Sequence, residues 1–410
     1  MHRSSVSSSQ TGARSHRSRI TTASELATKP EFDDWARELK LEKHIERNLT
    51  DTPIFSAIKT IQSHSKIFPP WVRDKRSNNY SFIPPAYQKW KDVLCSSLQA
   101  DDEYTFVDGG EADSAFPFAI GIIVQLCHHQ DRLASVNRTS LDSNTDIHFI
   151  LDSLMMHSCD GDGDEFLVYS TEQKLRLPAT SSTKANVVTT TADGVSSLDI
   201  IEFDPYTIHI DYRESMSAFS TKNPTLHLIL VHCVVEYKRL GVGENQMKMG
   251  MVSALYQKKV LGIHNQFVFG IFQFNKDGLQ VVAGIWEADT IKLYNVGKYS
   301  LRHPGSLVEL YLVLRGMKRL AADYRKELLN SSKTLRGVFK TNPPVNEWAT
   351  RDTNTIHELP EETDDEPQHG DSHFQRGLST LELWDMAARI NAFHESIRNC
   401  DPYSLWQVDP

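Results

Sequence analysis

The sequence predicts an α/β fold in which a central mixed β-sheet is flanked by helices, and three observations lead to this prediction. Residues 225–239 form a nearly continuous apolar run that ends in charged residues, as expected for a strand covered on both faces. Residues 244–263 follow it with helical periodicity. The segments 265–275 and 279–289 have strand-like composition and are joined by a Lys-Asp-Gly turn.

Composition places the chain among soluble proteins with a sizeable core. The chain has 410 residues, of which 40% are hydrophobic. Its net charge of −9 argues against a wholesale electrostatic grip on nucleic acid, although a local basic groove is compatible with that sum. Five scattered cysteines favour neither a disulfide framework nor a zinc site, and they indicate a reducing compartment.

The same data predict the compartment. The N-terminal segment has no apolar core of a secretory signal, and no run of about 18 apolar residues occurs. We therefore expect an intracellular protein, nuclear or cytoplasmic, with no membrane partner.

The organisation along the chain follows from charge and periodicity. The N-terminus is a basic, Ser-rich segment that we expect to be disordered. We expect the same of an acidic stretch near the C-terminus. Helices are predicted over 31–49, 85–100, 116–134 and 304–330. The predicted parts are a disordered tail (1–28), a helical N-terminal part packing on the core (31–135), the α/β core (136–335), an acidic linker (352–375) and a C-terminal part with an amphipathic helix (376–410).

The chemistry of the core centres on the sequence VVEYKR at 234–239. Residues two apart in a strand point to one side, so Glu236 and Lys238 project together from the end of a buried strand. A carboxylate there, with a second one from a neighbouring strand, suits Mg²⁺ or Mn²⁺, and the main-chain carbonyl of Tyr237 offers a further ligand. Lys238 would then orient the attacking water or stabilise the transition state of phosphodiester hydrolysis.

The second carboxylate has several candidates. Asp199 lies in the strand-like segment 194–203, which follows an Asp-Gly turn at 193–194, and it is the preferred ligand. Asp211, in the short β-like run 207–214, is its rival. Glu202 and Asp204 are alternates for the same site.

An Asp in one strand, Glu-x-Lys in the next central strand, then a helix and two strands resembles the PD-(D/E)XK, or restriction-endonuclease-like, superfamily. The resemblance covers residues of about 190–290 and is greatest to divergent nuclease-like regions of fungal proteins that occur beside fungal-type kinase domains or in Crinkler-type effectors. It implies a restriction-endonuclease-like core and a nucleic-acid partner, DNA or RNA. The residue before Asp199 is Leu198, where the family usually has Pro.

The resemblance also implies further site residues. Gln257, or failing it Gln246, matches the polar residue that family members carry on the helix after Glu-x-Lys. Glu111 and Asp113 are candidates for the acidic residue of the first core helix. The sequence therefore predicts a metal-dependent nuclease, and the alternative is a catalytically degenerate nuclease fold that binds nucleic acid or protein.

Overall fold

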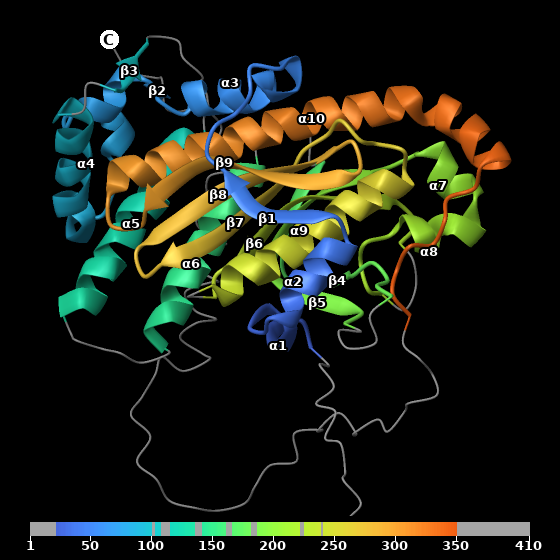
Figure 1. The fold of residues 1–410 in the computed structure, drawn as a ribbon. Coiled ribbons are helices and arrows are strands. Elements are labelled where there is room, and N and C mark those ends of the chain that lie inside the picture. The colour runs from blue at the N-terminus through green and yellow to red at the C-terminus, as the bar shows by residue number, and fades with distance from the viewer. Residues whose placement is uncertain are drawn as a thin grey trace, which may run out of the picture. The chain divides into compact units, whose positions relative to one another are not determined.

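A seven-stranded mixed sheet lies at the centre of the computed structural model (Figure 1). The strand order is β1-β9-β8-β7-β6-β5-β4, and only the pairs β1/β9 and β6/β7 are parallel among the described strands of this sheet. The strands are β1 (Leu41–Glu46), β4 (Leu167–Arg176), β5 (Thr189–Ile200), β6 (Leu228–Glu236), β7 (Val268–Asn275), β8 (Gly278–Glu287) and β9 (Thr290–Ser300). A separate parallel pair joins β2 (Ile67–Phe68) to β3 (Thr105–Phe106).

The structure describes residues 22–100, 103–107, 115–135, 142–160, 166–181, 187–221, 225–238 and 241–350. The chain divides into two compact units, 1–351 and 352–410, and the described residues belong to the first. The described helices are α1 (Ala23–Ala27), α2 (Glu31–Glu38), α3 (Ser56–His64), α4 (Gln88–Ala100), α5 (Phe116–Ser135), α6 (Asp142–Cys159), α7 (Asp204–Ile208), α8 (Arg213–Met216), α9 (Val242–Val260) and α10 (Pro304–Thr341). Short 3₁₀ helices are η1 (Pro53–Phe55), η2 (Pro70–Arg73), η3 (Asn78–Tyr80), η4 (Pro85–Tyr87) and η5 (Ile210–Tyr212).

Strand β6 is interior, as the apolar run predicted. It pairs with β5 on one side and with β7 on the other, and nearly all of its side chains are buried. Burial of each large aliphatic side chain contributes roughly 1.5–3 kcal/mol, so this strand can tolerate a charged residue only at its end. Glu236 is that end residue.

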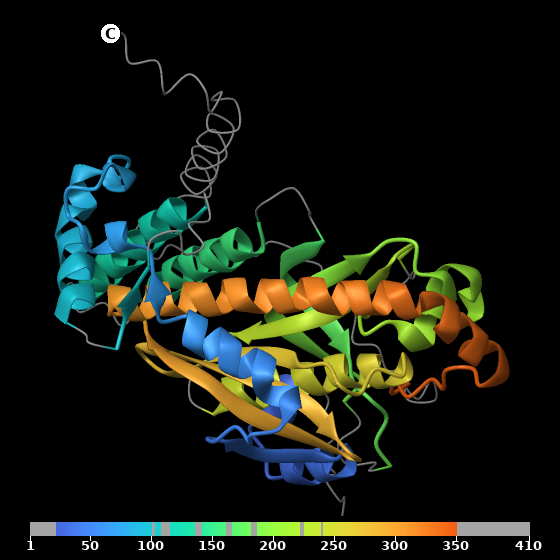
Figure 2. The same ribbon diagram turned by 90° about the horizontal axis from the view of Figure 1, so that it is seen from above.

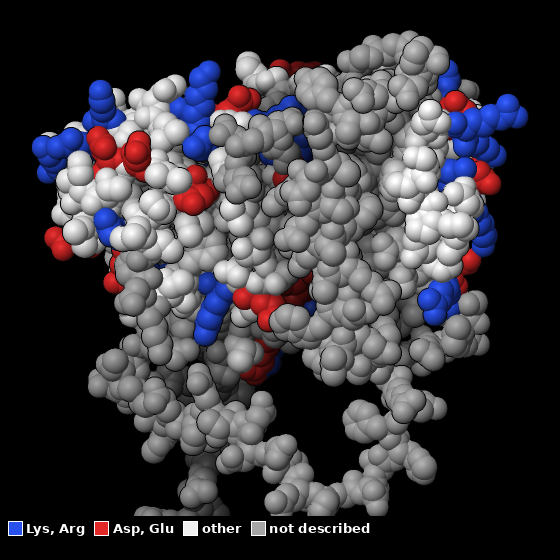
Figure 3. Space-filling model, turned by 180° about the vertical axis from the view of Figure 1, so that it is seen from behind, with Lys and Arg blue, Asp and Glu red and all other residues white. Residues whose placement is uncertain are grey.

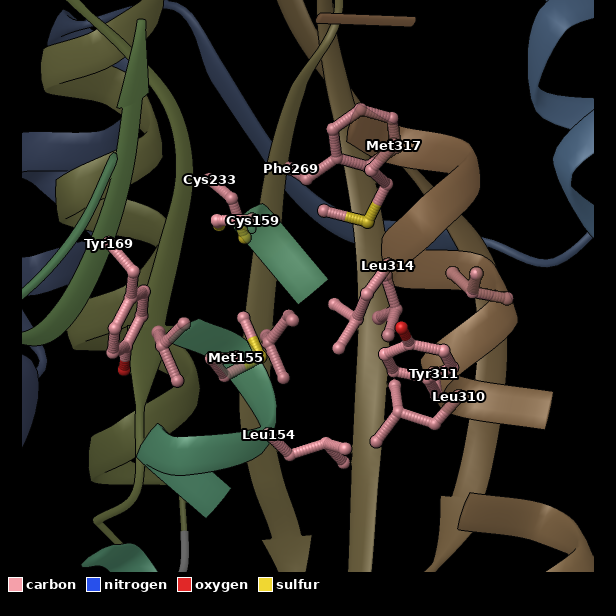
Figure 4. Packing of buried hydrophobic residues seen from close by; sticks show 14 of the residues in the cluster. Leu154, Met155, Cys159, Tyr169, Cys233, Phe269, Leu310, Tyr311, Leu314 and Met317 are labelled. Atoms are coloured by element: carbon pink, nitrogen blue, oxygen red, sulfur yellow. The ribbon is translucent and has the colours of Figure 1, made fainter. Parts of the chain in front are cut away.

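Two apolar cores cover the two faces of the sheet. Alternate β6 residues such as Val234 face α9, with α1 and α2 contributing to the same core. The intervening residues, such as Val235 and Tyr237, face the core built by α3, α5, α6 and α10. Figure 2 shows α10 running along the length of the sheet, and Figure 4 shows side chains of α6 and α10 meeting residues of β4, β6 and β7. The mixed sheet with helices on both faces is thus as predicted.

Several predicted elements were wrong. The helix expected over 31–49 ends at Glu38, and the following residues form edge strand β1 of the sheet. The segment 207–214 is mostly helical rather than β, because it lies in α7, η5 and α8. Residues 22–28 of the expected tail belong to the fold instead, because helix α1 lies there and its Leu26 is fully buried. The Asp-Gly pair at 193–194 is not a turn but lies inside β5.

Charge is mixed on the face seen in Figure 3, where Lys and Arg side chains are interspersed with Asp and Glu over the described residues. No helix within the described ranges is long and apolar enough to cross a membrane.

Candidate metal-ligating carboxylate site

The antiparallel register of β5 and β6 brings Asp193 beside Glu236. Gly194 pairs with Val235, so the next positions along the two strands are Asp193 and Glu236. The amide N–H of Tyr237 donates a hydrogen bond of 2.7 Å to Oδ2 of Asp193, which fixes this carboxylate against the end of β6. Asp193 is therefore a carboxylate from a neighbouring strand that lies beside Glu236.

Lys238 lies against both carboxylates. Its Nζ atom is 3.1 Å from Oε1 of Glu236 and 3.9 Å from Oδ1 of Asp193. Two acidic groups thus share one ammonium group, and Oε1 of Glu236 makes no directed hydrogen bond within the described structure. The three side chains form a compact charged group at one end of the central strands.

Exposure differs strongly among the three. The Glu236 side chain is 1% exposed, whereas Asp193 is 28% and Lys238 is 45% exposed. The pKa of Glu236 is raised from 4.5 to about 8, first because burial disfavours its charged form and second because Asp193 is close. Lys238 opposes this shift. One lysine therefore does not offset the burial of Glu236 next to a second carboxylate. A further cation at this point would stabilise the charged form of Glu236.

These residues could hold a hard divalent cation. Among the described residues, no group of three His, Cys, Asp or Glu side chains gathers into a metal-ligating cluster. Mg²⁺ characteristically binds through one or two carboxylates and keeps several waters, so Asp193 and Glu236 suit it without a third acidic side chain. The carbonyl of Tyr237 is at the same strand end and could complete the protein ligands.

Tyr237 secures this strand end from the other face of the sheet. Its hydroxyl donates a hydrogen bond of 2.8 Å to Oδ1 of Asp152 on α6, and Tyr169 donates one of 2.5 Å to the same oxygen. The ring of His148 stacks on Tyr237 with centroids 4.7 Å apart. Burial is the main cause of the raised pKa of Asp152, the two phenols lower it, and Asp193 raises it. The middle residue of Glu-Tyr-Lys is thus held by a polar cluster behind the site.

The structure does not bring Asp199 to this site. Asp199 pairs with Ile229, seven positions along β6 from Glu236, which corresponds to ~23 Å at 3.3 Å per residue. The prediction of Asp199 rests on the turn-like composition of Asp193-Gly194, which places the start of the strand after this pair, whereas β5 runs through it. The signal that could have found Asp193 is its parity: it faces the same side of β5 as buried Val195.

The other predicted positions are also apart from Glu236. Asp211 is exposed in η5, outside the sheet, and Glu202 and Asp204 follow the end of β5. Gln257 is fully buried, and it donates to the carbonyls of Met216 and Ile229 and accepts from the N–H of Val231, so it holds the far part of β6.

The remaining candidates divide between a buried residue and undescribed ones. Gln246 is buried near the start of α9, where its amide donates to Oγ of Ser24. Glu111 and Asp113 lie outside the described residues. Asp152, which no sequence motif indicated, is the acidic residue that α6 places behind the site.

Comparisons with protein-family models, with curated proteins and with solved structures found no match to this chain.

Proposed function

We propose that the protein is a metal-dependent nuclease with a restriction-endonuclease-like core, in which Asp193, Glu236 and Lys238 form the active site. The observation that carries this proposal is the register that places Asp193 beside Glu236, with Lys238 in contact with both. The order of elements supports it, because α6 precedes three antiparallel strands (β4, β5 and β6), and α9 then leads to β7, which is parallel to β6. An Asp in the middle strand and Glu-x-Lys in the next agree with the PD-(D/E)XK pattern.

Each residue has a distinct role in the proposed reaction. A water molecule loses a proton as its oxygen attacks phosphorus, the bond from phosphorus to the leaving oxygen breaks, and the leaving oxygen takes up a proton. Asp193 and Glu236 would hold Mg²⁺ or Mn²⁺, which supplies neutralisation of phosphate charge and activation of water. Lys238 orients the water and stabilises the negative charge that develops on the phosphate oxygens. Tyr237, through its contacts with Asp152 and Tyr169, keeps Glu236 and Lys238 in position.

The proposal is tested by comparing cleavage and metal binding in matched variants. Wild-type protein should cleave labelled DNA or RNA with Mg²⁺ or Mn²⁺ and stop with EDTA. Glu236→Gln and Asp193→Asn should each reduce cleavage at least about 100-fold and weaken Mn²⁺ binding measured by calorimetry, because each removes a ligand charge. Lys238→Ala should lose cleavage but still bind Mn²⁺, because its role is in the transition state.

Asp199→Asn is the matched control, because it makes the same chemical change on the same strand far from Glu236. It should cleave like the wild type. If Asp193→Asn retains full cleavage while Asp199→Asn loses it, the assignment of Asp193 is wrong. The contrary result is wild-type protein that binds nucleic acid equally well in EDTA and shows no cleavage with any divalent metal tried. A catalytically degenerate binding module would then be the better description.

A further inference from the structure

A row of side chains crosses the sheet from the carboxylate site to a basic cavity near strand β1. Pairing registers place Glu236 opposite Phe272, Phe272 opposite Gln280, and Gln280 opposite Lys298. Side chains at paired positions project from the same face of a sheet. At ~4.8 Å per strand, Lys298 lies ~14 Å from Glu236 along this row. The side chains of the site and of the cavity therefore project from one face of the sheet, the face on which α9 packs.

The cavity has a volume of about 400 Å³ and is rich in cations. Side chains from β1, β8, β9 and the first turn of α9 form its wall, and they include Lys43, Arg47, Glu244, Gln280, Asn295 and Lys298. Figure 1 shows β1, β9 and β8 side by side at this edge of the sheet. A cavity of this size accepts a small-molecule-sized unit such as one nucleotide, whereas a duplex is too wide to enter it.

Its charge is only partly neutralised. Arg47 and Lys298 are exposed and form no ion pair within the described residues, and Nζ of Lys298 lies 5.0 Å from the centre of the Phe274 ring. Lys43 is paired with Asp33. Glu244 is 2.6 Å from Nζ of Lys248, so its negative charge is already matched. Two cations remain for an external anion.

The cavity also offers amide groups. The Gln280 amide donates a hydrogen bond of 2.8 Å to Oδ1 of Asn295, which leaves Oε1 of Gln280 and the Nδ2 group of Asn295 for a ligand. Amides of this kind bond to the edges of nucleic-acid bases or to sugar hydroxyls, while Arg and Lys bond to phosphates. The combination suits a nucleotide rather than a simple anion.

We propose that this cavity binds a single nucleic-acid strand beside the cleaved bond, with Arg47 and Lys298 on its phosphates. The inference rests on the proposed nuclease function. A distance of ~14 Å corresponds to about four nucleotide steps of ~3.4 Å in B-form and to fewer in an extended strand. The protein thus takes hold of the strand at two points, the carboxylate site and the β1 cavity.

The test compares charge reversals in the cavity with the same reversals elsewhere. Arg47→Glu/Lys298→Glu removes both unmatched cations, and Lys326→Glu/Lys333→Glu makes an equal change of net charge at exposed positions of α10, on the other face of the sheet. Binding of labelled single-stranded DNA, single-stranded RNA and duplex DNA is followed by fluorescence anisotropy in EDTA, where no cleavage occurs, at several salt concentrations.

The cavity variant should bind a single strand about tenfold more weakly or worse than the wild type, and its salt slope should fall by about 1.4, because each lost phosphate contact contributes about 0.7. The α10 variant should bind nearly as the wild type does. A cavity variant that binds single strands like the α10 variant, a loss confined to duplex, or wild-type protein that binds no strand would each overturn the proposal.

These outcomes are separate from those of the nuclease test. If wild-type protein cleaves nothing with Mg²⁺ or Mn²⁺ but the cavity variant alone loses strand binding, the strand site stands and the nuclease proposal fails. If wild-type protein cleaves and the two double variants bind alike, the nuclease proposal stands and the strand site fails.

Discussion

At the residue scale, Lys258 shows how far a sequence pattern can mislead. The sequence Gln-Lys-Lys at 257–259 suggests a polar helix face with lysines free for a phosphate, but Lys258 is fully buried. Its Nζ atom donates to the carbonyl of Phe267 at 2.8 Å and lies 4.6 Å from the centre of the Tyr324 ring. Burial lowers its pKa from 10.5 to about 7, and Glu327 on α10 opposes this shift.

This lysine predicts a specific dependence of stability on pH. Between pH 7 and 10.5 the unfolded chain keeps the Lys258 proton while the folded protein releases it, so the free energy of unfolding should rise with pH across that window. Urea denaturation of the wild type and of Lys258→Met at pH 7, 8, 9 and 10 checks this. The difference between them should change by roughly 4 kcal/mol in favour of the wild type toward pH 10.

The comparison removes contributions that both proteins share, such as those of the buried tyrosines. His232 on β6 and Glu327 and Tyr324 on α10 are titratable groups that interact with Lys258, and all three remain in the variant. A difference that stays constant from pH 7 to 10 would mean that Lys258 is protonated in the folded protein throughout.

At the element scale, the helices and strands that the sequence predicts correctly are those that other elements bury. Strands β6, β7 and β8 and helices α5, α9 and α10 have strong apolar patterns because they are covered by other elements, and the sequence predicted each of them. Strand β1 reads LEKHIE and carries charges because it is an edge strand, so it was merged with the helix before it. Strand β5 holds Asp193-Gly194 within it, which local composition assigns to a turn.

The candidate site was predictable in part for the same reason. Glu236 and Lys238 follow from two-residue alternation within one strand. Asp193 depends on the register between two strands that are about 40 residues apart in sequence, which local patterns do not determine. Asp152 lies in a helix whose sequence carries no motif, and only packing places it behind Tyr237.

The start of α9 gives a prediction about how the site is built. A Cβ atom on Gly243 would lie 2.0 Å from the carbonyl oxygen of Lys238, and this backbone oxygen cannot move without moving the strand end. Gly243→Ala should therefore displace Lys238, reduce stability by about 1–3 kcal/mol, and weaken cleavage at least tenfold while Mn²⁺ binding changes little. Thermal melts, calorimetry and the cleavage assay report these effects.

Gly337→Ala is the control, because nothing lies within 4 Å of the added Cβ in α10 and Ala favours a helix over Gly. It should melt at or above the wild-type temperature. A Gly243→Ala protein with unchanged melting temperature and cleavage rate would show that this close approach does not position Lys238.

At the scale of the whole molecule, the N-terminal elements are part of the main fold. Helices α1 and α2 and strand β1 supply buried residues such as Leu26, Phe32 and Trp35 to the core on the α9 face. The amide of Asn245 on α9 donates to the carbonyl of Ala27 at 2.8 Å. The 38 residues of α10, ~57 Å of helix, cover the other face.

A chain that begins at Asp51 should therefore fold poorly, because it leaves one face of the sheet and one side of β9 uncovered. We expect a lower melting temperature, a less cooperative transition and greater binding of a hydrophobic dye than in the full-length chain. Equal melting of the two proteins would mean that α1, α2 and β1 are accessory to the fold.

The edges of the sheet have a consequence for self-association. Unpaired strand edges can recruit the same strand of another molecule and start aggregation. Strand β1 is short, carries an irregular register to β9, and presents charged side chains such as Lys43. Strand β4, at the other edge, contains Glu172 with a φ of 52°, an unusual backbone conformation for a strand, and its residue Leu175 is bridged to Phe219. Both edges of the sheet are therefore poor templates for a further strand. This favours a protein that does not aggregate through its strand edges at high concentration.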